Sequence, residues 1–147
     1  MDLWVKNLLR KKLDLEKFQR PNIDKEQAIQ LLEQSQKDGD VVIIASQKNK
    51  IIFIIRYESP WIAELDLIAD TGGNKKLYVE CKKIKDWFWK NYPHVHKLQM
   101  QTINEKLAKF AEKVGWVKEG IKKESYIDFN TMKYKDEYIY GLINPNH

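Results

Sequence analysis

The stretch INEKLAKFAEKVGWVKEG, residues 103–120, carries complete start and stop signals for one helix. Asn104 can accept the unpaired N–H groups at a helix start, and Gly115 readily takes the left-handed conformation at a helix end. Apolar residues recur between them at helical spacing, namely Leu107, Phe110, Ala111 and Val114. The stretch predicts a capped helix whose apolar face, with Phe110 buried, packs on a sheet, followed by a strand that begins at Trp116.

The rest of the chain predicts strands on both sides of this helix. Downstream, two strands are expected at 116–129 and 133–143, and the turn NTM joins them. Upstream, β-branched or alternating runs predict four strands, at 40–47, 50–57, 61–70 and 95–103. Three further segments have apolar residues at helical spacing, at 2–13, 21–39 and 76–92.

This element order predicts an α/β fold. The strand–loop–helix–strand unit over 61–103 is the pattern of a right-handed crossover between two parallel strands. The other consecutive strands are joined by short turns, which favour antiparallel pairs. We therefore expect a mixed, mostly antiparallel sheet with helices on both faces.

The strand expected at 61–70 has two chemically different faces. Because side chains alternate along a strand, one face carries only apolar side chains: Trp61, Ala63, Leu65, Leu67 and Ala69. The other face carries carboxylates between isoleucines: Ile62, Glu64, Asp66, Ile68 and Asp70. One face is expected to be packed, and the other offers acidic groups to a site or to solvent.

Length and composition narrow the class of protein. The chain has 147 residues, which suits one domain over 1–147. The single cysteine, Cys81, excludes an internal disulfide and favours a buried thiol, and three histidines with one cysteine make no zinc pattern. No apolar run approaches the ~20 residues of a membrane span, and the first residues lack the order of a signal peptide. A cytoplasmic protein is expected.

The net charge of +5 favours anionic partners, but its distribution weakens that indication. The 26 basic residues are interleaved with 21 acidic ones, and only three of the basic residues are arginines. Arginine is the residue that reads bases and phosphates in a bidentate way. A solvated surface is the better interpretation, and nucleic acid is disfavoured as a partner.

Two apolar segments leave alternatives open. The run DWFWKNY, residues 86–92, places aromatic side chains in several directions around a helix, so some must be buried and at least one exposed. An exposed tryptophan fits contact with a protein partner or a second copy better than stacking on nucleic acid. The N-terminal helix is either a docking element or a lid on the sheet.

The element order over residues 24–143, together with the motif in 104–120, resembles the GNAT superfamily of acyl-CoA N-acyltransferases. In that family the last helix commonly begins with Asn and ends in Gly followed by an aromatic residue. The matching positions here are Asn104, Leu107, Phe110, Gly115 and Trp116. The Glu-Gly pair at 119–120 is similar to the start of the family's closing hairpin.

The resemblance implies that acetyl-CoA lies in a cleft where the strands at 61–70 and 95–103 splay apart. It implies that the pantetheine pairs with the backbone of Leu67, Ile68, Ala69 and Asp70. It places the pyrophosphate on the following loop and helix start, near Gly72, Gly73, Asn74, Lys75 and Lys76, with Asn104 also at the cofactor site. Exposed N–H groups at a helix start attract anions, and glycine permits close backbone approach.

Two features depart from the family pattern. The family's loop usually has Arg or Gln, two residues, Gly, one residue, and Gly or Ala. Here the glycines come early and the later glycine places hold Asn74 and Lys76, whose side chains would obstruct the pyrophosphate. Many members also place a Tyr general acid where this chain has Ala111. Lys75 and Lys76 either meet phosphates as point charges or are solvated residues.

A transferase also needs a base for the acceptor amine. Glu64 and Asp66 are the candidates, with ordinary surface carboxylates as the alternative. The resemblance thus implies an N-acetyltransferase for an unknown amine, with backbone amides near Ile68 polarising the thioester carbonyl. The alternative is a catalytically inactive GNAT-fold protein of a phage virion, of head assembly or of host interaction, in which case the location would be the virion. A basic nucleic-acid binder ranks last.

Overall fold

The computed structural model describes residues 1–13, 23–69, 75–128 and 131–146. The described elements are α1 (Leu3–Lys12), α2 (Lys25–Lys37), β1 (Val41–Ser46), β2 (Ile51–Ser59), β3 (Ile62–Ala69), α3 (Lys75–Asn91), β4 (Lys97–Thr102), α4 (Glu105–Val114), β5 (Val117–Asp128) and β6 (Lys133–Ile143). Each expected helix and strand is present, with ends that differ by a few residues. The strand expected from Trp116 begins at Val117, and Trp116 itself is buried.

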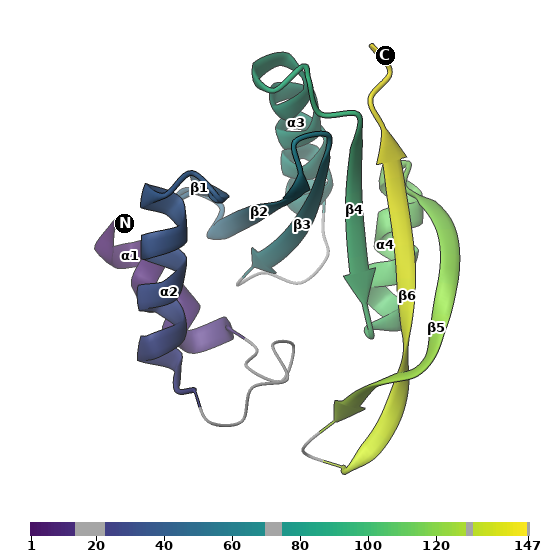
Figure 1. The fold of residues 1–147 in the computed structure, drawn as a ribbon, viewed down its shortest axis with the longest axis horizontal. Helices are drawn as coiled ribbons and strands as arrows, with labels where there is room; N and C mark the ends of the chain where they lie inside the picture. Colours follow the sequence, from purple (N-terminus) through teal and green to yellow (C-terminus); the bar gives the residue numbers. More distant parts are fainter. Residues whose placement is uncertain (14–22, 70–74, 129–130, 147) are drawn as a thin grey trace.

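The described strands form one mixed sheet with the order β1-β2-β3-β4-β6-β5 (Figure 1). Four of the five neighbouring pairs are antiparallel, and β3 and β4 are parallel. Helix α3 makes the crossover between the two parallel strands. The expected α/β class and strand arrangement are confirmed.

The parallel pair is short. β3 and β4 pair only at Ile62–Lys97, Ala63–Leu98 and Glu64–Gln99. Beyond these positions β3 stays paired with β2 as far as Ala69, and β4 stays paired with β6 as far as Thr102. The two strands therefore separate along the second half of β3, and the expected splay is confirmed.

Helices cover both faces of the sheet and make two apolar cores. Helices α3 and α4 pack on the face that carries Ala63 and Leu65 of β3. Helices α1 and α2 pack on the opposite face, against Ile52 and Ile54 of β2 (Figure 1). Since α1 buries Val5, Leu8 and Leu9 in this second core, it is a lid on the sheet, as one of the two alternatives predicted.

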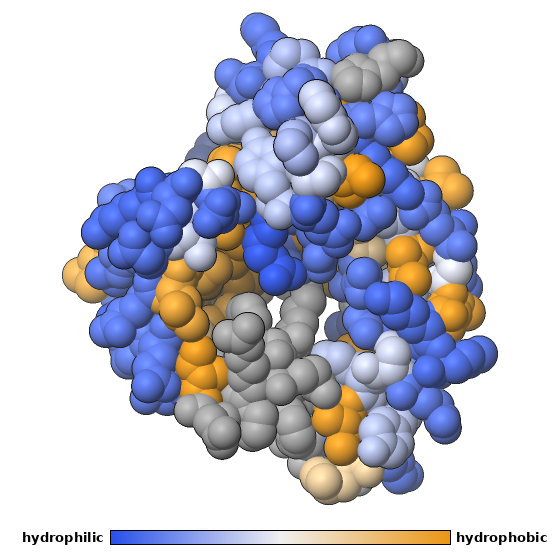
Figure 2. Space-filling model, viewed as in Figure 1, coloured by the Kyte–Doolittle hydropathy of each residue, from blue (hydrophilic) through white to orange (hydrophobic). Residues whose placement is uncertain are grey.

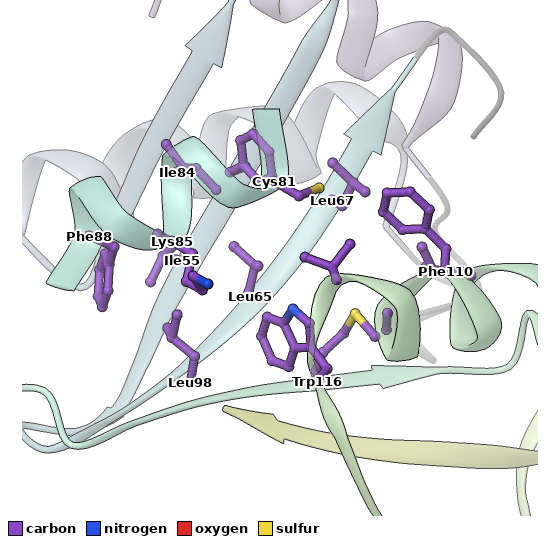
Figure 3. Close-up of a pocket in the computed structure, with 15 residues that line it drawn as sticks. Ile55, Leu65, Leu67, Cys81, Ile84, Lys85, Phe88, Leu98, Phe110 and Trp116 are labelled. Atoms are coloured by element: carbon purple, nitrogen blue, oxygen red, sulfur yellow. The ribbon is translucent and has the colours of Figure 1, made fainter. Parts of the chain in front are cut away.

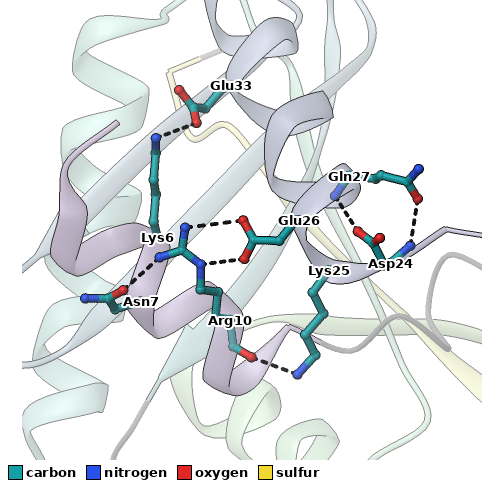
Figure 4. Close-up of polar contacts among 8 residues, drawn as sticks. All are labelled: Lys6, Asn7, Arg10, Asp24, Lys25, Glu26, Gln27 and Glu33. Carbon is teal, nitrogen blue, oxygen red and sulfur yellow. Dashed lines mark hydrogen bonds and ion pairs between the residues drawn. The ribbon is translucent and has the colours of Figure 1, made fainter.

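Ion pairs hold α1 to α2, and a capping box starts α2 (Figure 4). Asp24 caps α2 as expected: its side chain accepts the N–H of Gln27 at 2.8 Å, and the Gln27 side chain accepts the N–H of Asp24 at 2.9 Å. Across the helix pair, Arg10 forms a two-bonded ion pair with Glu26. These polar contacts lie on the rim of a core that is otherwise apolar.

Helix α4 has the predicted caps but not the predicted burial. The Asn104 side chain accepts the N–H groups of Lys106 and Leu107 at 2.9 and 3.2 Å, and Gly115 has a φ of 106°. The expectation that Phe110 is buried was wrong, because Phe110 and Leu107 are only half-buried. The helix presents its smaller side chains to the sheet, namely Ala108, Ala111 and Val114, and turns the two larger ones toward α3.

The surface agrees with the interleaved charges of the sequence. On the face shown in Figure 2, hydrophilic residues predominate and hydrophobic ones are interspersed. The aromatic run of α3 divides as expected: Phe88 and Trp89 are buried, whereas Trp87 is 42% exposed. Among the described helices, none is both long and apolar enough to span a membrane.

Candidate functional site

The site begins with the backbone of β3 where it leaves β4. In the described part of the sheet, residues 65–69 pair with β2 on one edge and have no strand partner on the edge that faces β4. The N–H and C=O groups on an unpaired strand edge can form a ladder with an extended ligand. The geometry therefore supplies main-chain hydrogen-bonding groups along a gap in the sheet.

A narrow apolar cavity adjoins this gap on the face covered by α3 and α4. Its volume is about 30 Å³, room for little more than one water-sized sphere. Figure 3 shows side chains of β3, α3 and α4 converging on it. The lining residues are Phe53, Ile55, Leu65, Leu67, Cys81, Ile84, Lys85, Phe88, Leu98, Met100, Leu107, Phe110, Ala111, Val114 and Trp116. Such a lining suits an aliphatic chain better than a charged group.

Cys81 reaches this cavity from α3 (Figure 3). Burial, with a smaller contribution from the nearby Glu80 carboxylate, raises the pKa of the Cys81 thiol to about 12. A thiol with so high a pKa is almost entirely protonated at neutral pH, and the thiolate is the reactive form. Cys81 therefore acts as an apolar wall of the cavity; the sequence favoured a buried thiol, and the residue is half-buried.

A wider cavity lies at the far end of the gap, beside the β5–β6 hairpin. It has a volume of about 390 Å³ and is lined by Leu67, Gln101, Thr102, Ile103, Asn104, Tyr126, Lys135 and Glu137. Leu67 lines both cavities, so both adjoin the splayed part of β3. Most of its lining side chains are polar, and they include carboxylate, ammonium, amide and hydroxyl groups.

The two candidate bases lie on the opposite face of β3. Glu64 and Asp66 alternate with Ala63 and Leu65, which face α3 and α4. One nitrogen, Nη2 of Arg56, lies 3.2 Å from Glu64 Oε1 and 3.2 Å from Asp66 Oδ2. The carboxylate side chains are only 16% and 15% exposed, so they are ion-paired and largely buried rather than ordinary surface groups.

The other predicted site residues fall into four groups. Leu67, Ile68 and Ala69 are half-buried on β3 along the gap. Lys75 and Lys76 are exposed in the first turn of α3, and Asn104 lines the wider cavity while its side-chain oxygen caps α4. A fourth set, Asp70, Gly72, Gly73 and Asn74, lies outside the described residues.

The sequence reasoning missed Arg56 and the hairpin residues of the wider cavity. Arg56 lies directly opposite Glu64 in the β2–β3 register. That register depends on the turn at 58–60 and its β-bulge, so the identity of the residues alone did not fix it. Tyr126, Lys135 and Glu137 reach the site only because the hairpin extends beyond the end of β4.

Solved acetyltransferases share this architecture. The spermidine N-acetyltransferase from Vibrio cholerae, in complex with CoA and spermine, matches with a TM-score of 0.79 and 15% identity, over 99% of this chain and 94% of that chain. A ribosomal L7/L12 α-N-protein acetyltransferase in complex with coenzyme A matches with a TM-score of 0.72 and 14% identity, over 99% and 86%. An acetyltransferase of the GNAT family from Streptococcus pneumoniae matches with a TM-score of 0.64 and 16% identity, over 84% and 79%.

The chain therefore has the GNAT fold, as the motif in 104–120 predicted. No protein-family model matches the sequence, and no curated protein is similar enough in sequence to match. At these sequence identities the likeness establishes the fold but not the reaction, which depends on the residues of the site.

Proposed function

We propose that the protein is an N-acetyltransferase that transfers an acetyl group from acetyl-CoA to an amine. The observation that carries the proposal is the gap between β3 and β4, which has an apolar cavity on one face and two largely buried carboxylates on the other. A thioester bound from one face and an amine bound from the other would meet in this gap. Both solved neighbours described with coenzyme A are acetyltransferases of the same fold.

The cofactor would use the main chain of β3. The unpaired edge at Leu67, Ile68 and Ala69 can hydrogen-bond the two pantetheine amides as a neighbouring strand would. The start of α3 and the ammonium groups of Lys75 and Lys76 can attract the phosphates. The proposal includes Asp70, Gly72, Gly73 and Asn74 on the connecting loop, as the resemblance implies.

The transfer needs one bond made and one broken. The amine nitrogen bonds to the thioester carbonyl carbon, and the carbon–sulfur bond breaks. Glu64 or Asp66 takes the proton that the nitrogen loses. A cationic amine first loses one proton to solvent, which frees the lone pair that attacks. The departing sulfur takes its proton from water, because the family's usual phenol is replaced by the methyl group of Ala111. The protonated acid returns its proton to the hydroxide that is left. Backbone N–H groups near Ile68 would stabilise the negative carbonyl oxygen.

The proposed acceptor is a primary amine, carried by a small molecule or by a protein. The solved neighbours are named for spermidine and for a ribosomal-protein α-amine. Both kinds of amine are cationic at neutral pH. Glu64 and Asp66 carry two negative charges, and their shared partner Arg56 carries one positive charge, which leaves one negative charge in excess. This excess suits a cationic acceptor.

A catalytically inactive GNAT-fold protein, such as a phage virion, head-assembly or host-interaction protein, is the second candidate. The observation that favours it is Ala111, which is buried and offers no proton at the position of the usual general acid. Such a protein would bind its partner tightly and would neither bind acetyl-CoA nor release thiol.

The test combines binding with turnover. We expect the melting temperature to rise with acetyl-CoA, and CoA thiol to be released when spermidine or an N-terminal peptide is added. Glu64→Gln or Asp66→Asn should lower the transfer rate by about 10²–10⁴-fold while acetyl-CoA still raises the melting temperature, since only proton acceptance is lost. Glu58→Gln, an exposed carboxylate on β2, is the matched control. No change in melting temperature at millimolar acetyl-CoA would reject the proposal.

A further inference from the structure

Arg56 occupies a defined place at the junction of the two parallel strands. Its partner in the β2–β3 register is Glu64, and Glu64 is also the last residue of β3 that pairs with β4. Asp66 is two residues further along β3, on the same face and on the splayed side of that point. The guanidinium therefore spans the position at which the gap in the sheet opens.

The contact is a bridge from one nitrogen to two acids. Nη2 of Arg56 lies 3.2 Å from an oxygen of each carboxylate. Two carboxylates so close together repel each other, and a shared cation offsets that repulsion and restricts both side chains. The Arg56 side chain is 39% exposed, whereas the carboxylate side chains are about 15% exposed, so the cation lies nearer to solvent than the acids it holds.

We infer that Arg56 is a positioning residue for acyl transfer, which holds the Glu64 and Asp66 carboxylates at the mouth of the gap. The inference rests on the proposed function. Arg56 acts through the two acids and touches neither the thioester nor the acceptor. It is set apart from a structural ion pair by where it lies, because the residues it fixes lie where β3 and β4 separate.

Loss of the bridge should affect turnover more than binding of the cofactor. In Arg56→Gln the two acids lose their shared partner and can adopt several rotamers, and a misplacement of about 1 Å can cost 10²-fold in rate. We expect kcat to fall roughly 10- to 100-fold. The Kd for acetyl-CoA should stay within about twofold, since the apolar cavity lies on the other face of the sheet. Arg56→Lys keeps the charge without the planar fork and should restore part of the rate.

The decisive measurement is a double-mutant cycle on the purified full chain. Arg56→Gln is combined with Glu64→Gln or Asp66→Asn, whichever costs more alone. If Arg56 works through that acid, Arg56→Gln should have almost no further effect on kcat in the combined variant. Arg10→Gln is the matched control, because it breaks the two-bonded ion pair with Glu26 between α1 and α2 and lies away from the gap.

Each outcome decides the matter. A kcat in Arg56→Gln equal to that of the wild type, or the same drop with and without the acid, would overturn the inference and leave the proposed function intact. If Arg56→Gln does not fold, Arg56→Met, which keeps the apolar stem without the charge, takes its place in the cycle, and the same two outcomes would overturn the inference. A wild-type chain that neither binds acetyl-CoA nor releases thiol would overturn the proposed function, and this inference with it.

Discussion

Ala111 sets the dimensions of the apolar cavity. It is buried at 3% exposure, packs between α4 and the sheet, and lines the cavity beside Phe110 and Val114. A larger side chain at this position would have to occupy the cavity itself, whose volume is about 30 Å³. A tyrosine at this position would therefore fill the cavity and crowd its walls.

Replacing Ala111 with Tyr should destabilise the protein. The ring cannot fit without moving its neighbours, and overpacking a core costs typically 1–3 kcal/mol. We expect a loss in this range in the free energy of unfolding, measured by urea denaturation, and a transfer rate that is unchanged or lower. Ala111→Ser, which adds one atom, is the control for side-chain size. An increase in both stability and rate would mean that the cavity is larger than described.

The thiol of Cys81 should be nearly inert in the folded protein. Burial raises its pKa to about 12, so at pH 8 its thiolate fraction is roughly 10³-fold below that of an exposed cysteine. Alkylation by iodoacetamide should be slow at pH 8, accelerate as the pH rises toward 12, and become fast in urea. Mass spectrometry of the labelled chain reports the rate. Rapid labelling at pH 8 without denaturant would contradict this protonation state.

The last helix shows what the caps of an element contribute. Asn104 Oδ1 accepts two backbone N–H groups that would otherwise be unpaired, and Gly115 ends the helix at a φ of 106°. Together the two residues fix where α4 starts and stops, and hence where Ala111 meets the sheet. The same caps also hold Asn104 at the edge of the wider cavity.

Asn104→Ala should cost about 1 kcal/mol of stability, the usual effect of removing an N-cap. Asn104→Ser, which retains an acceptor oxygen, should recover most of this loss. Thermal unfolding of the three proteins measures the difference. If the alanine variant also lost acetyl-CoA affinity and the serine variant did not, the cap would be linked to the cofactor site through the position of α4.

Whole elements were predictable because their signals are local. Asn104, Gly115 and Asp24 mark helix ends by hydrogen-bonding chemistry that depends on a few neighbouring residues. Which residues of an element are buried was harder to predict from the sequence. Helical spacing placed Phe110 on the apolar face, but that face meets both the sheet and α3, and periodicity does not distinguish them. The bridge from Arg56 depends on strand register, which local patterns do not encode.

At the scale of the whole molecule, charge is dispersed rather than concentrated. The net charge of +5 arises from 26 basic and 21 acidic residues that are interleaved along the chain. A phosphate-bearing ligand would therefore depend on local cations. The first turn of α3 supplies two, Lys75 and Lys76, both exposed.

We expect the double variant Lys75→Ala, Lys76→Ala to bind acetyl-CoA about tenfold more weakly at low salt. Exposed charges are screened with a Debye length of about 10 Å at 0.1 M, so the wild type and the variant should converge as salt increases. Calorimetric titration at several ionic strengths gives both affinities. Lys82→Ala, Lys83→Ala, two exposed lysines later in α3, is the matched control. An affinity that ignores both lysines and salt would place the phosphates elsewhere.

The brevity of the β3–β4 pairing divides the sheet into two leaves. One leaf comprises β1, β2 and β3, and the other comprises β4, β6 and β5. In the described sheet, three paired residues of β3 and β4 join the two leaves. Mechanical tension across the sheet would concentrate on this seam, which should yield before either leaf unravels. A ligand bound in the gap would contact both leaves and hold them together. Its arrival should slow amide exchange on both leaves at once, including residues far from any contact with it.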